Sequence, residues 1–134
     1  MNIESEAREF KELTGRELPL SLIELYNEKG NGGFGPEYGL LGIISGHKTD
    51  LKDSMLSLYQ SLCSGDPDDP NWLWPKELVP FIHIGCAIHY CIDTANSTNR
   101  VVEFDPTDYD PEIGPKDHFK EISGSFSEWV TSNV

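Results

Sequence analysis

Residues 78–105 read LVPFIHIGCAIHYCIDTANSTNRVVEFD, and this stretch decides the fold. Gly85 and the polar run Thr94–Asn99 divide it into segments that have the length and the apolar, β-branched character of strands. Short connections of this kind join antiparallel neighbours in a sheet. The stretch therefore predicts an antiparallel meander of three strands: Leu78–Ile84, Ala87–Asp93 and Arg100–Asp105.

Two helices are predicted near the start of the chain. Gly15 stands where a helix commonly ends, after four apolar residues at helical spacing: Ile3, Ala7, Phe10 and Leu13. Pro19 is acceptable in the first turn of the second helix, and the glycine-rich run 30–33 ends it. The apolar face of this second helix consists of Leu22, Ile23, Leu25 and Tyr26.

One strand and one helix are expected between these helices and the meander. Tyr38–Ser45 is too short and too β-branched for a helix, so we interpret it as a strand. Thr49 or Asp50 is expected to cap the helix, and Gly65 is expected to end it. The apolar stripe of this helix is Leu51, Met55, Leu58 and Leu62.

A last helix is predicted after the meander. Ser125 and Glu128 form a capping-box pattern at its start, and Phe126, Trp129 and Val130 supply its apolar residues. Helices thus come before, between and after the strands without a repeating βαβ order. The sequence predicts a single α+β domain over residues 1–134.

The chain is strongly acidic, with ten Lys and Arg residues against twenty-three Asp and Glu, a net charge of −13. Nucleic-acid binders draw affinity from clustered cations, and anionic lipid headgroups repel acidic proteins, so the charge argues against nucleic-acid and membrane partners. It favours a basic protein partner. No apolar run has the length of a membrane span. The odd cysteine set, Cys63, Cys86 and Cys91, predicts free thiols in the cytoplasm.

No recognised motif for catalysis or ligand binding is present. The glycine cluster 30–35 follows a helix and lacks a lysine, so it predicts a turn and not a phosphate loop. Two histidines and two cysteines have the right chemistry for zinc, but their spacing fits no zinc signature: His83, Cys86, His89 and Cys91. No serine lies in a Gly-x-Ser-x-Gly sequence. We expect a protein that is not an enzyme and that has no metal and no cofactor.

Two acidic segments combine charge with aromatic rings. The first leads into Trp72 and Trp74, of which at least one is expected to cover the core. The second, residues 103–112, lacks the glycine that a calcium loop requires. Solvated loops, an interaction surface and the metal site of a hydrolase remain alternatives. The predicted partner-binding residues are Asp66, Asp68, Asp69, Trp72, Trp74, Asp105, Asp108, Tyr109, Asp110 and Glu112.

Several short motifs follow one another along the chain, beginning with Glu17-Leu18-Pro19, a helix through Tyr26 and Asn31-Gly32-Gly33. Further motifs are Leu78-Val79-Pro80-Phe81, Tyr90-Cys91-Ile92-Asp93, Val101-Val102-Glu103-Phe104-Asp105 and Ser125-Phe126-Ser127-Glu128-Trp129. Taken in this order, the motifs resemble the SUKH superfamily. The segment Gly85–His89 departs from the pattern, because the family usually carries more glycine and an acidic residue there.

The resemblance implies an α+β fold with a bent, mixed or antiparallel sheet flanked by helices. It also implies binding and not catalysis, since many bacterial members are immunity proteins that neutralise a toxin, often a nuclease, from a neighbouring cell. The expected function is an immunity protein that occludes a cognate, basic toxin. The alternative is a regulatory interaction module in signalling or cell-wall synthesis, as in fungal members.

Overall fold

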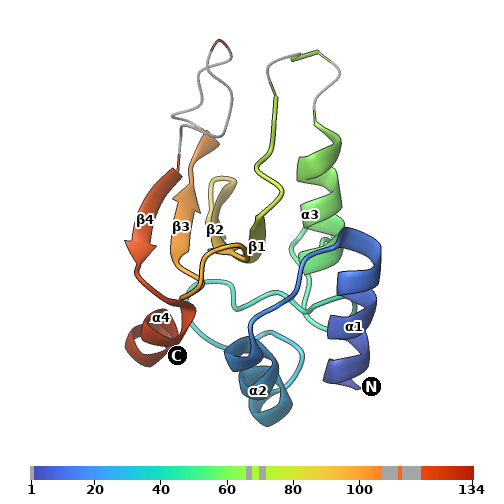
Figure 1. Cartoon of the computed structure of the whole chain (residues 1–134), viewed down its shortest axis with the longest axis vertical. Coiled ribbons are helices and arrows are strands. Elements are labelled where there is room, and N and C mark those ends of the chain that lie inside the picture. The colour runs from blue at the N-terminus through green and yellow to red at the C-terminus, as the bar shows by residue number, and fades with distance from the viewer. Residues whose placement is uncertain (1, 66–67, 70–71, 107–111, 113–118) are drawn as a thin grey trace.

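The computed structural model describes residues 2–65, 68–69, 72–106, 112 and 119–134 (Figure 1). Within these residues the order of elements confirms the α+β class. The elements are α1 (Ile3–Thr14), α2 (Leu20–Lys29), α3 (Met55–Ser64), β1 (Leu78–Gly85), β2 (Ile88–Asp93), β3 (Val101–Phe104), β4 (Phe119–Ser123) and α4 (Phe126–Asn133).

The described strands form one antiparallel sheet in the order β1-β2-β3-β4. The predicted meander is therefore confirmed. Its register places His83 opposite His89, His89 opposite Phe104, and Phe104 opposite Phe119, so these side chains form a row across one face. Strand β4 was not predicted, because charged Lys120 and Glu121 interrupt the alternation that marks a strand.

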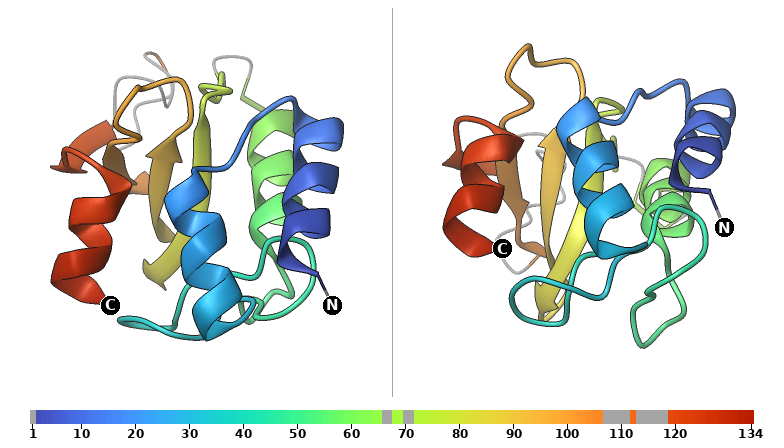
Figure 2. Two further views of the ribbon diagram at one scale, coloured as in Figure 1. Left: turned by 60° about the horizontal axis from the view of Figure 1, so that its bottom comes forward. Right: turned by 90° about the horizontal axis from the view of Figure 1, so that it is seen from below.

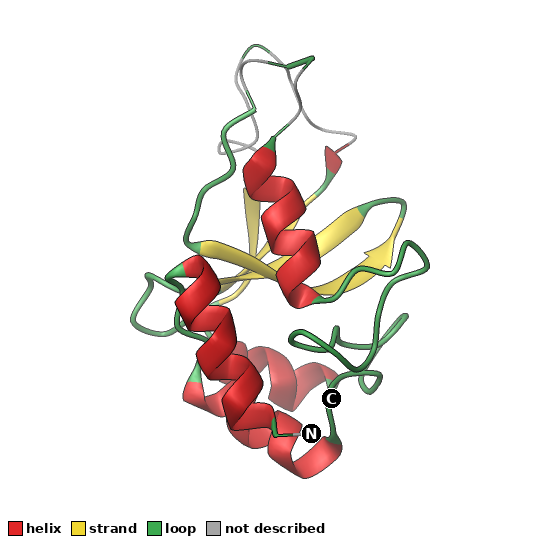
Figure 3. Cartoon of the chain, turned by 90° about the vertical axis from the view of Figure 1, so that its right-hand side faces the viewer, coloured by secondary structure: helices red, strands yellow, loops and turns green. Residues whose placement is uncertain are grey.

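Helices and the segment before β1 pack on the sheet, in part through aromatic rings. Figure 2 shows α2 and α4 side by side, and Figure 3 shows α3 lying across the sheet. The ring of Trp129 on α4 lies 4.9 Å from that of Phe81 on β1. Trp74, in the segment before β1, lies 5.2 Å from Phe104 and 5.3 Å from Phe119. Such edge-to-face contacts stabilise a core beyond the area that they bury.

The predicted strand Tyr38–Ser45 is wrong. Its one ladder contact among the described residues is a bridge between Leu40 and Ile82. Gly39 has φ +87°, which an extended strand does not adopt. The Leu41 amide still donates to Phe81 O on β1, but the amides of Gly42 and Ile43 donate to His47 O and Asn31 Oδ1, outside any ladder. This segment is instead the first part of a long loop, residues 38–53, which we call the 38–53 loop.

Helix α3 begins later than predicted. Its cap is Ser54 and not Thr49 or Asp50, since Ser54 Oγ accepts from the Ser57 amide and Ser57 Oγ accepts from the Ser54 amide. Leu51 therefore lies outside the helix and is 85 % exposed. Gly65 ends the helix as predicted.

The remaining helices match their predictions closely. Helix α1 ends at Gly15 with φ +76°, and α4 begins after Ser125, whose hydroxyl accepts from the Glu128 amide at 3.1 Å. Leu13, although it continues the apolar spacing of α1, is exposed.

Candidate functional site: a cleft beside the β1–β2 hairpin

A carboxylate from α1 fixes the 38–53 loop. Glu6 Oε1 accepts hydrogen bonds from the amides of Ile44 and Ser45, both at 2.9 Å, and from Asn31 Nδ2 at 3.1 Å. Burial would raise the pKa of Glu6, but these bonds and the bond from the Ser45 hydroxyl lower it below its ordinary value. We call this arrangement the Glu6 clamp. It holds the loop in one conformation.

The glycine cluster after α2 serves the same purpose. Asn31 Oδ1 accepts from the Ile43 amide at 2.9 Å, and Asn31 O accepts from the His47 amide at 3.0 Å. The amides of Gly32 and Gly33 already donate to carbonyl oxygens of Gly30 and Leu40. The cluster is thus the predicted turn, and it attaches the 38–53 loop to the end of α2.

Gly32→Ala is expected to lower the free energy of unfolding by about 3 kcal/mol. An added Cβ would lie 2.5 Å from Leu40 O, and the φ of +82° is unfavourable for alanine. Gly15→Ala is the matched control, because Gly15 also has a left-handed φ, +76°, but nothing lies within 4 Å of an added Cβ. The control should lose about 1 kcal/mol in urea unfolding. Equal losses would mean that the close approach of the loop does not matter.

The clamped loop and the β1–β2 hairpin enclose a cleft. Its main hollow, about 340 Å³, lies between Tyr38, His47 and Asp50 of the loop and His83 and Cys86 of the hairpin. A second hollow of about 190 Å³ shares Asp50 and His83 with the first. The main hollow alone has the volume of a small-ligand pocket. We call the two together the His83 cleft.

Stacked rings form one wall of the His83 cleft. The rings of Tyr38 and His83 lie 5.7 Å apart, and those of His83 and His89 lie 4.9 Å apart. His47 Nε2 lies 2.7 Å from Tyr38 O and helps to position that residue. Burial, with a smaller contribution from His83, lowers the pKa of His89 to about 4, although a backbone hydrogen bond at Ala87 opposes the change. The wall is therefore flat, and His89 within it is uncharged at neutral pH.

Strained backbone is concentrated at the edges of this cleft. Among the described residues, five that are not glycine have positive φ, and four of these belong to the cleft or its border: Glu37, Lys52, Cys86 and Ala87. Cys86 and Ala87 form the two-residue turn between β1 and β2, a geometry that usually selects Asn-Gly. Each such residue costs about 1–2 kcal/mol, and strain of this kind is typical of functional sites.

The described residues among those predicted to bind a partner do not belong to the His83 cleft. Asp66, Asp108, Tyr109 and Asp110 are outside the described residues. Asp68 and Glu112 are exposed, whereas Asp69 and Asp105 are half-buried. The described members of this acidic set do not line the His83 cleft, so its role in binding stays a prediction.

Trp72 and Trp74 close over the core, which confirms the expectation that at least one of them does. Trp74 is 6 % exposed and donates from Nε1 to Leu78 O at 2.9 Å. Trp72 is half-buried, donates from Nε1 to Leu62 O at 2.7 Å and stacks on Trp74 at 6.4 Å. These bonds tie α3 to the sheet.

Comparison with known protein families decides which family this fold represents. Residues 4–132 match the SMI1 / KNR4 family (SUKH-1). The chain belongs to this family. Proteins of the SUKH-1 family are known for roles in toxin immunity and in regulatory protein interactions, and not for catalysis. No curated protein and no solved structure matched the chain.

The candidate metal ligands of this SUKH-1 protein do not converge. Cys91 is fully buried, and burial raises the pKa of its thiol, while Cys86 is exposed in the hairpin turn. Within the described part of the chain, no group of three or more His, Cys, Asp or Glu side chains is placed to hold a metal ion. Nor does any described helix combine the length and the apolar character of a membrane span.

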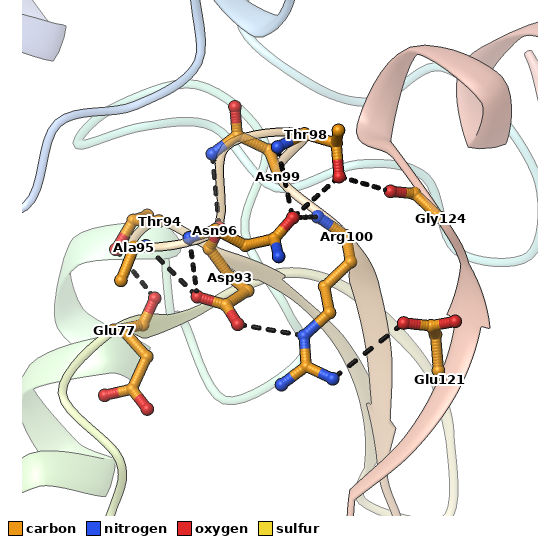
Figure 4. Close-up of polar contacts among 10 residues, drawn as sticks. All are labelled: Glu77, Asp93, Thr94, Ala95, Asn96, Thr98, Asn99, Arg100, Glu121 and Gly124. Carbon is orange, nitrogen blue, oxygen red and sulfur yellow. Dashed lines mark hydrogen bonds and ion pairs between the residues drawn. The ribbon is translucent and has the colours of Figure 1, made fainter.

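A second polar cluster in the SUKH-1 domain has a structural role. The Asp93 carboxylate accepts from the amides of Ala95 and Asn96 and from Arg100 Nε at 2.9 Å, as Figure 4 shows. Arg100 also lies 3.8 Å from Glu121 on β4. These groups satisfy one another and join the β2–β3 turn to the edge strand, so we assign the cluster to stability.

Sequence reasoning missed the His83 cleft because its two sides are distant in the chain. Residues 38–53 and 83–89 meet only through tertiary contacts. Two signals were available: the pair His83 and His89, which we considered as zinc ligands and not as the wall of a cleft, and the absence of Asn-Gly from the turn at Cys86-Ala87. The exposure of Leu51 was not expected, because the predicted helix began too early and included Leu51 in its apolar stripe.

Proposed function

We propose that this chain is an immunity protein that binds a cognate toxin domain and neutralises it by direct occlusion. The observation that carries this proposal is the SUKH-1 match over residues 4–132. The proposed place of action is the cytoplasm of the cell that makes the protein.

The charge suggests the kind of toxin. With a net charge of −13, the chain attracts basic proteins and repels acidic ones. Nuclease toxins must attract phosphates, and their active sites are therefore commonly cationic. Electrostatic steering of this kind raises association rates by about 10–10³-fold and weakens with added salt. A basic nuclease domain is the partner that fits best.

Co-expression tests the proposal directly. The chain is expressed together with the toxin encoded beside its gene, and survival is measured with complex formation by size-exclusion chromatography. Survival together with a complex is the expected result. Undiminished killing, with no complex even at low salt, would reject the immunity function.

Charge reversal in the second acidic segment is expected to slow binding. Asp108→Lys with Asp110→Lys should reduce the association rate about tenfold at low ionic strength, and much less at high salt, where screening removes steering. Glu9→Lys with Glu12→Lys, on the exposed side of α1, makes the same change in net charge and is the control. Stopped-flow kinetics at two salt concentrations gives the comparison. If both pairs slow association equally, the acidic segment is not the docking face.

The family also supports a regulatory interaction module as a second function. The neighbouring genes separate the two: a gene for a secreted toxin favours immunity, and a signalling or cell-wall gene favours regulation. A regulatory module should leave toxin activity unchanged in the co-expression experiment.

A further inference from the structure

The His83 cleft is formed before any partner arrives. The Glu6 clamp fixes one side, and the strained Cys86-Ala87 turn fixes the other. A site that is already ordered avoids much of the entropy that binding otherwise costs. The cleft is therefore suited to receive a side chain that projects from another protein.

The chemistry of the cleft selects among side chains. Tyr38 is 63 % exposed although its ring stacks on His83, so much of the ring surface is open to a partner. Two carboxylates, Asp50 and Asp53, line the hollows. Among the described residues that line them, Lys48 is the one Lys or Arg side chain. Asp53 Oδ1 accepts from Ser57 Oγ, whereas no described residue forms a hydrogen bond or ion pair with the Asp50 carboxylate. The cleft therefore offers an aromatic face beside an available anion.

We propose that the His83 cleft receives an arginine side chain of the partner protein, an inference that rests on the proposed immunity function. A guanidinium is planar, stacks on aromatic rings and donates two parallel hydrogen bonds to a carboxylate. It matches the Tyr38 ring and Asp50 together. An apolar side chain would instead leave the Asp50 carboxylate desolvated and unpaired, which is unfavourable. A lysine would pair with Asp50 but would stack less well.

A small probe tests the cleft without the toxin. Nα-acetyl-arginine amide is titrated into the isotope-labelled chain, and backbone NMR shifts are followed. We expect the largest shifts at residues 38, 47–53 and 83–87, with Nα-acetyl-lysine amide and Nα-acetyl-phenylalanine amide binding at least about threefold more weakly. Asp50→Asn should weaken arginine binding about fivefold. Shifts elsewhere, or equal binding of the three amides, would overturn the inference.

The toxin experiment separates this inference from the proposed function. Asp50→Asn and Tyr38→Ala are each expected to weaken toxin binding at least about tenfold, whereas Tyr38→Phe retains the ring and should retain binding. Leu20→Ala, at an exposed apolar residue of α2, is the control. Thermal melts confirm that each variant is folded. If the unaltered chain fails to bind the toxin, the immunity function is wrong. If it binds and the cleft variants bind equally well, only the arginine site is wrong.

Discussion

Replacing Glu6 with alanine is expected to lower the free energy of unfolding by about 3 kcal/mol. The change removes one acceptor from four donors at once: Asn31 Nδ2, the Ile44 and Ser45 amides and the Ser45 hydroxyl. Each donor that loses its partner in a partly buried position costs part of its desolvation energy. Urea unfolding followed by circular dichroism measures the loss.

Glu9→Ala is the control for this variant, since Glu9 lies on the same helix but is exposed. It should change stability by less than about 0.5 kcal/mol. Glu6→Gln retains an acceptor but not the charge and should fall between the two. A loss in Glu6→Ala no larger than that in Glu9→Ala would show that water replaces the clamp.

Acid is expected to destabilise the protein in a pH range set by His89. Its pKa is about 4 in the folded chain and 6.5 in the ordinary, unfolded state, so the unfolded chain binds the proton first as pH falls. The stabilisation is complete above pH 6.5 and is lost as pH decreases toward 4. The difference amounts to about 2 kcal/mol between pH 7.5 and 5, and about 3 kcal/mol once pH 4 is passed.

His89→Phe, which retains a flat ring, should remove this dependence between pH 6.5 and 4. Glu6 acts separately: its folded pKa is lowered from 4.5, so its contribution is present above pH 4.5 and is lost as pH falls further. Unfolding measured at each pH, with the His89 ring signals followed by NMR, resolves the two. A His89 ring that titrates near 6.5 in the folded chain would contradict the prediction.

The sequence was sufficient to predict those helices and strands whose local pattern agrees with their place in the tertiary structure. The meander over residues 78–105 has apolar strands and short polar turns, and the helices α1, α2 and α4 have caps that can be read directly. It was not sufficient for Tyr38–Ser45, which has strand composition but donates its amides to Asn31 and Glu6. Side-chain acceptors so far away in the sequence leave no periodic signal.

The candidate site was harder to predict for the same reason. Charge and family resemblance indicated a binding protein, but neither of them identifies which residues form the binding site. The acidic segments drew attention because their residues are consecutive, whereas Tyr38, Asp50 and His83 become neighbours only after folding. The tryptophans that were considered as binding residues are packed on Phe104 and on each other.

The Glu6 clamp connects Glu6 with Ile44 and Ser45, which follow it in the chain by 38 and 39 residues. We therefore expect the loop that borders the cleft to become ordered only once α1 has docked, because its amides then gain the Glu6 acceptor. The proposed arginine site would thus depend on the position of the N-terminal helix. We expect a fusion tag or a short deletion at the N-terminus to weaken binding without disrupting the meander. Tags for interaction assays are therefore better placed at the C-terminus.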